Sequence, residues 1–126
     1  MQLTMEDTGK ANRIRGYDVG SVTVNDTVYR QSIVVARDNL ITDWPPGAVD
    51  RLATTHLDQL LELDPELIII GTGSTQQFPD RDVLRHAILA GIGIEVMTTP
   101  AACRTYNVLM AENRRAVAAL FMMEKA

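Results

Sequence analysis

The chain has 126 residues, of which 46% are hydrophobic and 22% charged, a length and composition that predict one globular domain. Its formal net charge of -4 disfavours nucleic-acid and anionic-membrane surfaces, because phosphate binding needs clustered lysine and arginine. The single cysteine, Cys103, excludes an internal disulfide and favours a reducing compartment.

The start of the chain is polar and carries no apolar core of a secretory signal. We expect residues 1–12 to be a flexible N-terminus and residues 13–126 to form a single α/β domain. No stretch approaches the roughly 18 apolar residues that span a bilayer, so no membrane insertion is expected. These features predict a cytoplasmic protein.

The first half of the domain is predicted to be β-rich. Alternating residues on both sides of Asn25–Asp26 predict a hairpin with a two-residue turn. Pro45–Pro46–Gly47 ends this region. The strands expected here span 21–24, 27–32 and 40–44, and residues 33–36 either continue the second of these strands or start another.

The second half alternates helices with strands. Its most informative segment is Leu67–Ile70, which is apolar at every position and runs directly into Gly71–Thr72–Gly73. A strand that is apolar throughout is covered on both faces, which is typical of a central strand in a layered α/β sheet. Further strands are expected at 93–98 and 116–122, and the strand–helix–strand order from 67 to 97 predicts a parallel pair.

Three helices are predicted in this half, at 56–63, 81–90 and 100–112. The residues expected to begin them are Thr55 with Asp58 in a capping box, then Asp80 or Asp82, and Thr99 with Pro100 at the first helical position. Gly91 is expected to end the second helix in the left-handed conformation.

Gly71–Thr72–Gly73 follows the apolar strand at the end where open α/β sheets place their ligands. A dinucleotide fingerprint would need a third glycine where the chain has Gln76, and Pro79 delays the next helix. We therefore interpret the two glycines as the tight exit of a buried strand in preference to a nucleotide site. A small ligand or a peptide at this loop is the weaker alternative.

Cys103 lies in the first turn of a predicted helix beside Arg104, and both features lower the pKa of a thiol. A nucleophilic cysteine also needs a base, and the sequence places neither His56 nor His86 near it. Cys103 shares one face of this helix with the apolar residues Ala102, Tyr106, Leu109 and Met110. A structural core residue is therefore the favoured interpretation of Cys103. One cysteine and two histidines without ligand spacing predict no metal site, and we expect no cofactor and no catalytic residues.

The carboxyl ends of two predicted strands supply a candidate ligand-binding cleft, because parallel neighbours end at the same edge of a sheet. Arg104 would offer a fork for a carboxylate or phosphate, and Asn107, one helical turn later, would orient it. The competing interpretation, which the residues slightly favour, is a solvated helix face on which Arg104 pairs with an acid such as Glu95. The predicted cleft residues are Thr72, Gly73, Ser74, Thr98, Thr99, Arg104 and Asn107, with Trp44 nearby.

Three segments of the second half, Glu66–Gly73, Gly93–Met97 and Thr98–Leu109, resemble one small protein family. That family includes the mitochondrial complex I assembly factor three, the adipogenesis-associated domain-containing protein and many bacterial and archaeal proteins. The resemblance extends from Ile14 to Met122. Its most specific feature is Gly-Thr-Gly followed by a Thr-x-x-Ala-x-x-Thr-Tyr-Asn pattern.

The resemblance implies a three-layer α/β fold with a mixed central sheet and an additional N-terminal β layer. It implies no established enzymatic activity and no catalytic residues to carry over. The mitochondrial relative binds protein partners during assembly of respiratory complex I, and this chain resembles a bacterial member. Simple alternation favours a last strand parallel to its neighbours, whereas the family sheet contains an antiparallel strand, so the direction of 116–122 is open.

Two functions are compatible with these observations. The favoured one is a non-enzymatic, protein-binding or assembly-factor-like role with unidentified protein partners, and homo-oligomerisation is left open. The alternative is a small-molecule-binding protein or enzyme that uses the Gly71–Thr72–Gly73 cleft, with Cys103 or Glu95 as its titratable group. A partner-binding protein is expected to expose an apolar patch outside the cleft, and an enzyme to have a concave pocket with a perturbed pKa.

Overall fold

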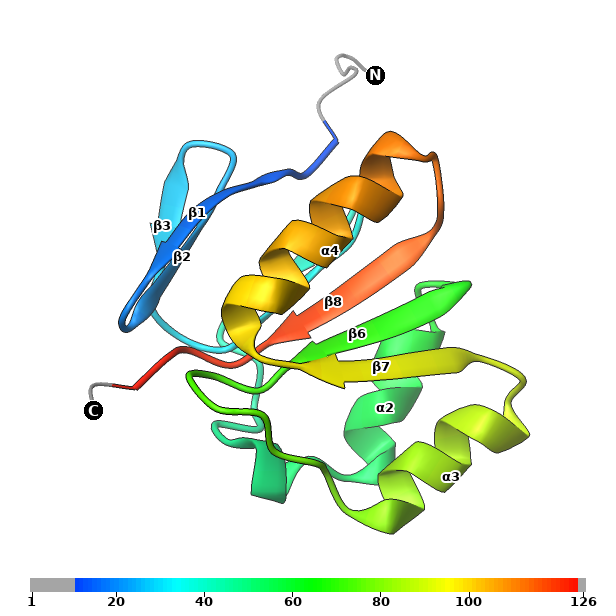
Figure 1. Ribbon diagram of the computed structural model, residues 1–126. Coiled ribbons are helices and arrows are strands. Elements are labelled where there is room, and N and C mark those ends of the chain that lie inside the picture. Colours follow the sequence, from blue (N-terminus) through cyan, green and yellow to red (C-terminus); the bar gives the residue numbers. More distant parts are fainter. Residues whose placement is uncertain (1–10, 125–126) are drawn as a thin grey trace.

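The computed structural model describes residues 11–124, which form two β-sheets and three α-helices (Figure 1). The N-terminal sheet has the antiparallel order β1 (Ile14–Asp18), β2 (Ser21–Val24), β3 (Thr27–Tyr29). The central sheet has the order β5 (Leu40–Ile41), β4 (Ile33–Val35), β8 (Ala116–Leu120), β6 (Leu67–Gly71), β7 (Gly93–Met97). The helices are the 3-10 turn η1 (Val49–Arg51) and the α-helices α2 (Thr54–Leu61), α3 (Arg81–Leu89) and α4 (Thr99–Ala111).

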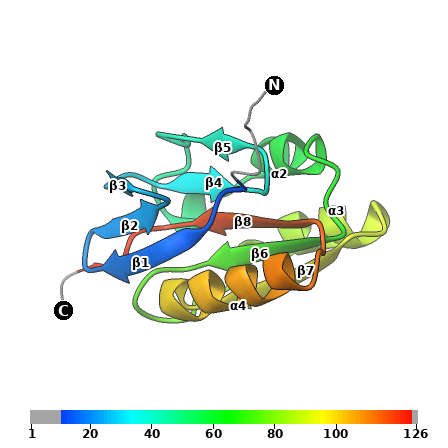
Figure 2. The same ribbon diagram turned by 90° about the horizontal axis from the view of Figure 1, so that it is seen from above.

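The central sheet lies between two layers (Figures 1 and 2). Helices α2 and α3 cover one face, while α4 and the N-terminal sheet cover the other. Each face has its own cluster of buried side chains, so two hydrophobic cores sandwich the sheet. This arrangement confirms the predicted three-layer α/β fold with a mixed central sheet and an additional N-terminal β layer.

Strand β6 lies inside the central sheet, with β7 and β8 both parallel to it. Ile68 and Ile70 pack toward α2 and α3, whereas Ile69 packs toward α4, and all three side chains are fully buried. Because successive side chains of a strand point to opposite faces, a strand covered on both sides must be apolar at every position. The prediction of a central strand here is confirmed.

The last strand has a parallel neighbour on one side and an antiparallel neighbour on the other. Strand β8 runs parallel to β6 but antiparallel to β4, with Val34 opposite Ala119. The parallel direction suggested by alternation and the antiparallel strand implied by the resemblance are therefore both present, and together they make the sheet mixed.

The beginnings of two helices differ from the prediction. Helix α2 starts at Thr54, and the imidazole Nδ1 of His56 accepts the backbone N–H of Ala53 at 3.0 Å, so the capping box at Thr55 and Asp58 is wrong. Helix α4 starts at Thr99, with Thr98 in the capping position and Pro100 in the second helical position. The side chain of Thr99 does not cap the helix, because other partners bind its hydroxyl.

The residues predicted to begin and end helix α3 are confirmed. The carboxylate of Asp80 accepts the backbone N–H of Asp82 at 2.9 Å, as an N-cap does. Gly91 follows the helix at φ +75°, and Ile92 donates its N–H to the carbonyl of Ala87 at 3.0 Å. A glycine in this left-handed conformation ends the helix as predicted.

The N-terminal half contains the predicted hairpin, and its turn residue Asn25 has φ +54°. Strand β1 was not predicted, because a shift of register between Ile14 and Gly16 interrupts its alternation. Strand β5 ends at Ile41, short of the predicted 40–44, since Asp43 turns the backbone to φ +50°. Among residues 11–124, no helix combines the length and apolar character needed to cross a membrane.

Candidate functional site

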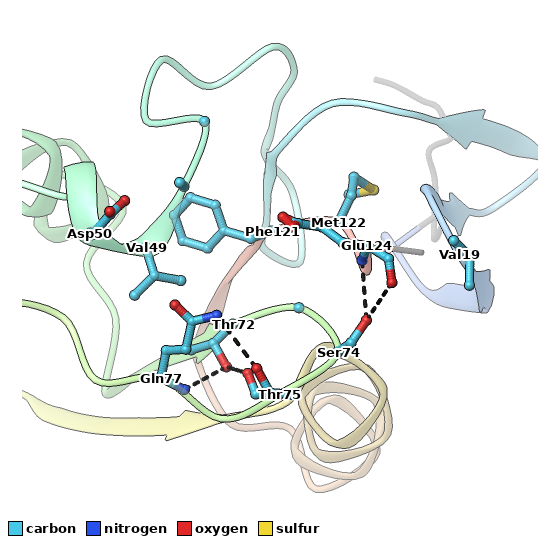
Figure 3. Close-up of a pocket in the computed structure, with 13 residues that line it drawn as sticks. Val19, Val49, Asp50, Thr72, Ser74, Thr75, Gln77, Phe121, Met122 and Glu124 are labelled. Carbon is cyan, nitrogen blue, oxygen red and sulfur yellow. Dashed lines mark hydrogen bonds between the residues drawn. The ribbon is translucent and has the colours of Figure 1, made fainter. Parts of the chain in front are cut away.

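A pocket of about 700 Å³ lies at the carboxyl ends of β6 and β8 (Figure 3). Three segments line it: residues 47–50 around η1, residues 72–75 and 77 after β6, and residues 121, 122 and 124 after β8. Val19, which follows β1, completes the lining. The ends of two parallel neighbours therefore do meet at a concave surface, as open α/β sheets favour.

One side of the pocket is apolar. Val49, Phe121 and Met122 contribute side chains to it, as Figure 3 shows. The ring of Phe121 packs on Trp44 with 5.9 Å between ring centroids. Trp44 itself is buried and donates its indole N–H to Gln59 at 2.9 Å, so it supports the pocket from behind Phe121 without lining it.

The hydroxyl groups on the other side bind the protein's own backbone. Thr72 donates to the carbonyl of Thr75 at 2.7 Å and accepts the N–H of Gln77 at 3.2 Å. Ser74 donates to the carbonyl of Glu124 at 3.0 Å and accepts the N–H of the same residue at 3.1 Å (Figure 3). These bonds hold the loop in shape and fasten the C-terminal segment to it.

The two glycines of this loop have separate structural causes. A Cβ on Gly71 would lie 2.9 Å from Leu120 Cδ2, 3.0 Å from Ala102 Cβ and 3.1 Å from the Cα of Thr99, which is closer than side chains pack. Gly73 has φ +95°, and its N–H donates to the hydroxyl of Thr99 at 2.8 Å. Both observations support the interpretation of the motif as a tight strand exit, since one glycine admits α4 and the other makes the turn.

The Gly71→Ala variant is expected to lose about 1–3 kcal/mol of unfolding free energy, because the added methyl group overpacks the contact between β6 and α4. Urea unfolding followed by circular dichroism measures this loss. Gly47→Ala is the matched control, since a Cβ on Gly47 meets nothing within 4 Å. Equal stability of the two variants would contradict the packing explanation.

The predicted cleft residues divide into two groups. Thr72, Gly73 and Ser74 line the pocket, whereas Thr98, Thr99, Arg104 and Asn107 do not. Thr99 is fully buried: its hydroxyl accepts the Gly73 N–H and donates to the carbonyl of Phe121 at 2.6 Å. Thr98 occupies the capping position of α4 without a capping bond. A ligand at the three pocket residues stays a prediction.

Arg104 and Asn107 face the N-terminal sheet. Arg104 donates to the hydroxyl of Tyr17 at 2.8 Å, and Glu95 is not its partner. The side-chain amide of Asn107 accepts the N–H of Ile14 at 3.1 Å and donates to the Ile14 carbonyl at 2.7 Å. Asn107 therefore extends the hydrogen bonding of β1 onto α4, which joins the two parts of this layer.

Cys103 is buried against the sheet on the inner side of α4. Burial raises the pKa of its thiol from 9.0 to about 12, although the nearby Arg104 acts in the opposite direction. A thiol that keeps its proton at neutral pH is a poor nucleophile. The favoured interpretation of Cys103 as a structural core residue is supported.

Iodoacetamide at pH 8 is expected to leave Cys103 of the folded protein unmodified, because the thiol is both buried and protonated. The same reagent is expected to modify the protein fully in urea. Intact-mass spectrometry measures both outcomes. Rapid modification under native conditions would revive the interpretation of Cys103 as a reactive residue.

Among residues 11–124, no group of three histidine, cysteine, aspartate or glutamate side chains is arranged to hold a metal ion. His86 Nε2 lies 2.6 Å from the Asp58 carboxylate, and this pair links α3 to α2.

Several residues that line the pocket were not predicted from the sequence. Phe121 and Met122 follow a strand parallel to β6, so their place could have been found once that direction was known. Val49 and Asp50 lie on a short 3-10 turn, for which the sequence carries no periodic signal.

The family model described as "Protein of unknown function (DUF498/DUF598)" matches residues 14–121. The chain belongs to this family. The match extends from β1 to the pocket residue Phe121, so it includes both sheets and all three α-helices.

The chain is similar to curated proteins of different kinds. The human NADH dehydrogenase (ubiquinone) 1 alpha subcomplex assembly factor 3 is 41% identical over 82 residues, which are 64% of this chain and 45% of that protein. The "13 kDa major membrane protein" of Francisella tularensis is 38% identical over 66 residues, which are 52% of this chain and 54% of that protein. The chain thus spans about half the length of the curated relatives it matches.

The fold also matches solved structures. A crystal structure of a Bordetella parapertussis protein has a TM-score of 0.85 and 34% sequence identity, and the match covers 90% of this chain and 98% of that chain. The resemblance to the family of the complex I assembly factor, inferred from the sequence, is confirmed.

Proposed function

We propose that this protein binds another protein and acts in the manner of an assembly factor. The human relative is named as an assembly factor, and it is 41% identical to this chain over 82 residues. The observation that carries the proposal is an apolar surface at the carboxyl end of α3, outside the pocket.

This surface, the α3 patch, consists of Ile88 and Leu89. Their side chains are 68% and 79% exposed, although the inner side of the same helix buries Val83 and Ala87 against the core. Phe78, 67% exposed, lies in the loop that leads into α3. Contiguous exposed apolar surface is typical of protein interaction sites, and Ile88 and Leu89 are neighbours at the end of the helix.

The test is affinity capture from extract of the cells that make the protein, with the Ile88→Ser/Leu89→Ser double variant beside the unchanged chain. We expect at least one protein to be retained by the unchanged chain and lost from the double variant. Val28→Ser, a change of an exposed residue on β3, is the matched control and should retain the partner. Equal capture by all three chains, or capture of nothing, would contradict the proposal.

The second candidate is a small-molecule ligand in the pocket of Figure 3, favoured by its volume of about 700 Å³ and its place at the strand ends. The chemistry of this pocket differs from that of the predicted cleft, in which Arg104 would bind a carboxylate or phosphate. None of the described lining residues is basic, whereas Asp50 and Glu124 are acidic. A neutral or cationic ligand therefore fits the pocket better than a carboxylate or phosphate.

A thermal-shift screen of small molecules tests this candidate. A true pocket ligand raises the melting temperature of the unchanged chain and not that of Ala48→Phe, whose ring would fill part of the pocket. Ala90→Phe, which does not change the pocket lining, should keep the response. No response in the unchanged chain would remove the candidate.

A further inference from the structure

Strand β7 forms one edge of the central sheet, and no strand of residues 11–124 lies along its outer side. Thr72 donates its N–H to the carbonyl of Met97 at 2.8 Å, so the backbone groups of Met97 point inward to β6. Because backbone groups alternate along a strand, those of Ile94 and Val96 point outward. The edge therefore presents two residues with N–H and C=O groups directed away from the sheet.

These two residues have four outward backbone groups, and a side chain forms a hydrogen bond with one of them. The amide of Gln76, in the loop after β6, donates to the carbonyl of Val96 at 2.9 Å. In the described part of the chain, the outer N–H groups of Ile94 and Val96 and the outer carbonyl of Ile94 have no protein partner. A row of unpaired backbone groups at a sheet edge is a template for an added strand.

The two faces of this edge differ in character. Ile94 and Val96 pack toward α3, the helix that carries the α3 patch. Glu95 is exposed on the opposite face, and no described cation lies within ion-pair distance of its carboxylate. A strand laid along β7 would therefore meet apolar surface on one face and a negative charge on the other.

The charge of Glu95 also identifies the kind of strand that fits. If two copies of this chain paired antiparallel through both Ile94 and Val96, Glu95 of one copy would lie directly opposite Glu95 of the other, about 5 Å away. Like charges opposite each other on a sheet destabilise the pair, whereas opposite charges stabilise it. The edge is thus unfavourable for self-pairing in this register and favourable for a strand with a basic residue.

We propose that β7 binds an extended segment of a partner protein as an additional parallel or antiparallel strand, with lysine or arginine beside Glu95 and apolar residues toward α3. This inference rests on the proposed protein-binding function and names the part of the partner that is recognised. The bound strand replaces the Gln76 amide at the Val96 carbonyl and supplies partners for the other outer groups.

The probe is a displayed library of short random peptides, selected on the full chain. We expect the enriched peptides to alternate β-branched or aromatic residues with lysine or arginine. Their affinity should fall at least about tenfold for Glu95→Lys, which reverses the charge, and for Val96→Pro, which removes an outward N–H. Glu112→Lys, the same charge change at an exposed site after α4, is the matched control and should leave affinity unchanged.

Two outcomes would overturn the inference. One is enrichment of peptides that bind Glu95→Lys and Val96→Pro as well as the unchanged chain, and the other is no enrichment. Circular dichroism of both variants checks that they fold, and Glu95→Lys changes only an exposed side chain. Affinity capture with the α3 patch variant tests the proposed function separately: a partner that depends on Ile88 and Leu89 but not on Glu95 or Val96 leaves that function standing and removes the β7 edge.

Discussion

Ile69→Asp is expected to prevent the protein from folding. Ile69 is fully buried in the middle of β6, under α4, and β7 and β8 flank its strand on both sides. An unpaired carboxylate there costs about 4–5 kcal/mol or more, which is comparable with the total stability of a domain. Far-UV circular dichroism and urea unfolding measure the result.

Val28→Asp is the control for this experiment, because it places the same charge on an exposed position of β3. Its free energy of unfolding should lie within about 0.5 kcal/mol of that of the unchanged chain, as is usual for surface substitutions. A folded Ile69→Asp protein with an unchanged urea midpoint would show that β6 is not the buried centre of the sheet.

Thr99→Val is expected to destabilise the protein by about 2–6 kcal/mol, although it preserves the shape of the side chain. The hydroxyl of Thr99 accepts the N–H of Gly73 at 2.8 Å and donates to the carbonyl of Phe121 at 2.6 Å, in a site without solvent. Valine leaves both backbone groups unpaired, and each unpaired buried group costs about 1–3 kcal/mol.

The neighbouring Thr98→Val is the matched control, since the Thr98 side chain makes no capping hydrogen bond. Its effect should stay below about 1 kcal/mol. Urea unfolding of the two variants side by side makes the comparison, and equal stabilities would mean that the Thr99 bridge contributes nothing. A loss confined to Thr99→Val would show that this hydroxyl joins the ends of β6 and β8 to the start of α4.

The sequence predicted the central strand and the end of α3 correctly because both depend on local causes. Leu67–Ile70 must be apolar on both faces wherever its neighbours lie, and Gly91 supplies a left-handed residue at a helix end. Thr99 also had a local explanation as a helix cap, but its hydroxyl binds Phe121, which is 22 positions away. A partner so distant cannot be found from local pattern.

The candidate site was found only in part, for the same reason. The rule that parallel strands share an edge brought Thr72, Gly73 and Ser74 to the pocket. Arg104 and Asn107 belong to α4 near that edge, but which neighbour they meet depends on where β1 packs. The register shift that hides β1 in the sequence therefore also hides the partners of both side chains.

The β7 edge and the α3 patch were missed because neither is marked by a motif. The backbone groups of Ile94 and Val96 are outward only because β7 is the last strand of the sheet, which is a property of topology. Ile88 directly follows the buried Ala87 in the same helix, yet the structure leaves it largely exposed. An apolar residue on a helix is thus evidence for an interface only once its burial is known.

Hydrogen exchange at single residues, with and without the captured partner, tests the central claim that the β7 edge of this protein binds another protein. In the free protein, the outward amides of Ile94 and Val96 should exchange fast, whereas that of Met97, which points to β6, should be protected. With the partner bound, exchange at Ile94 and Val96 should slow by at least about tenfold, because both amides gain acceptors. Unchanged exchange at both amides in the bound state would contradict binding of the partner at the β7 edge.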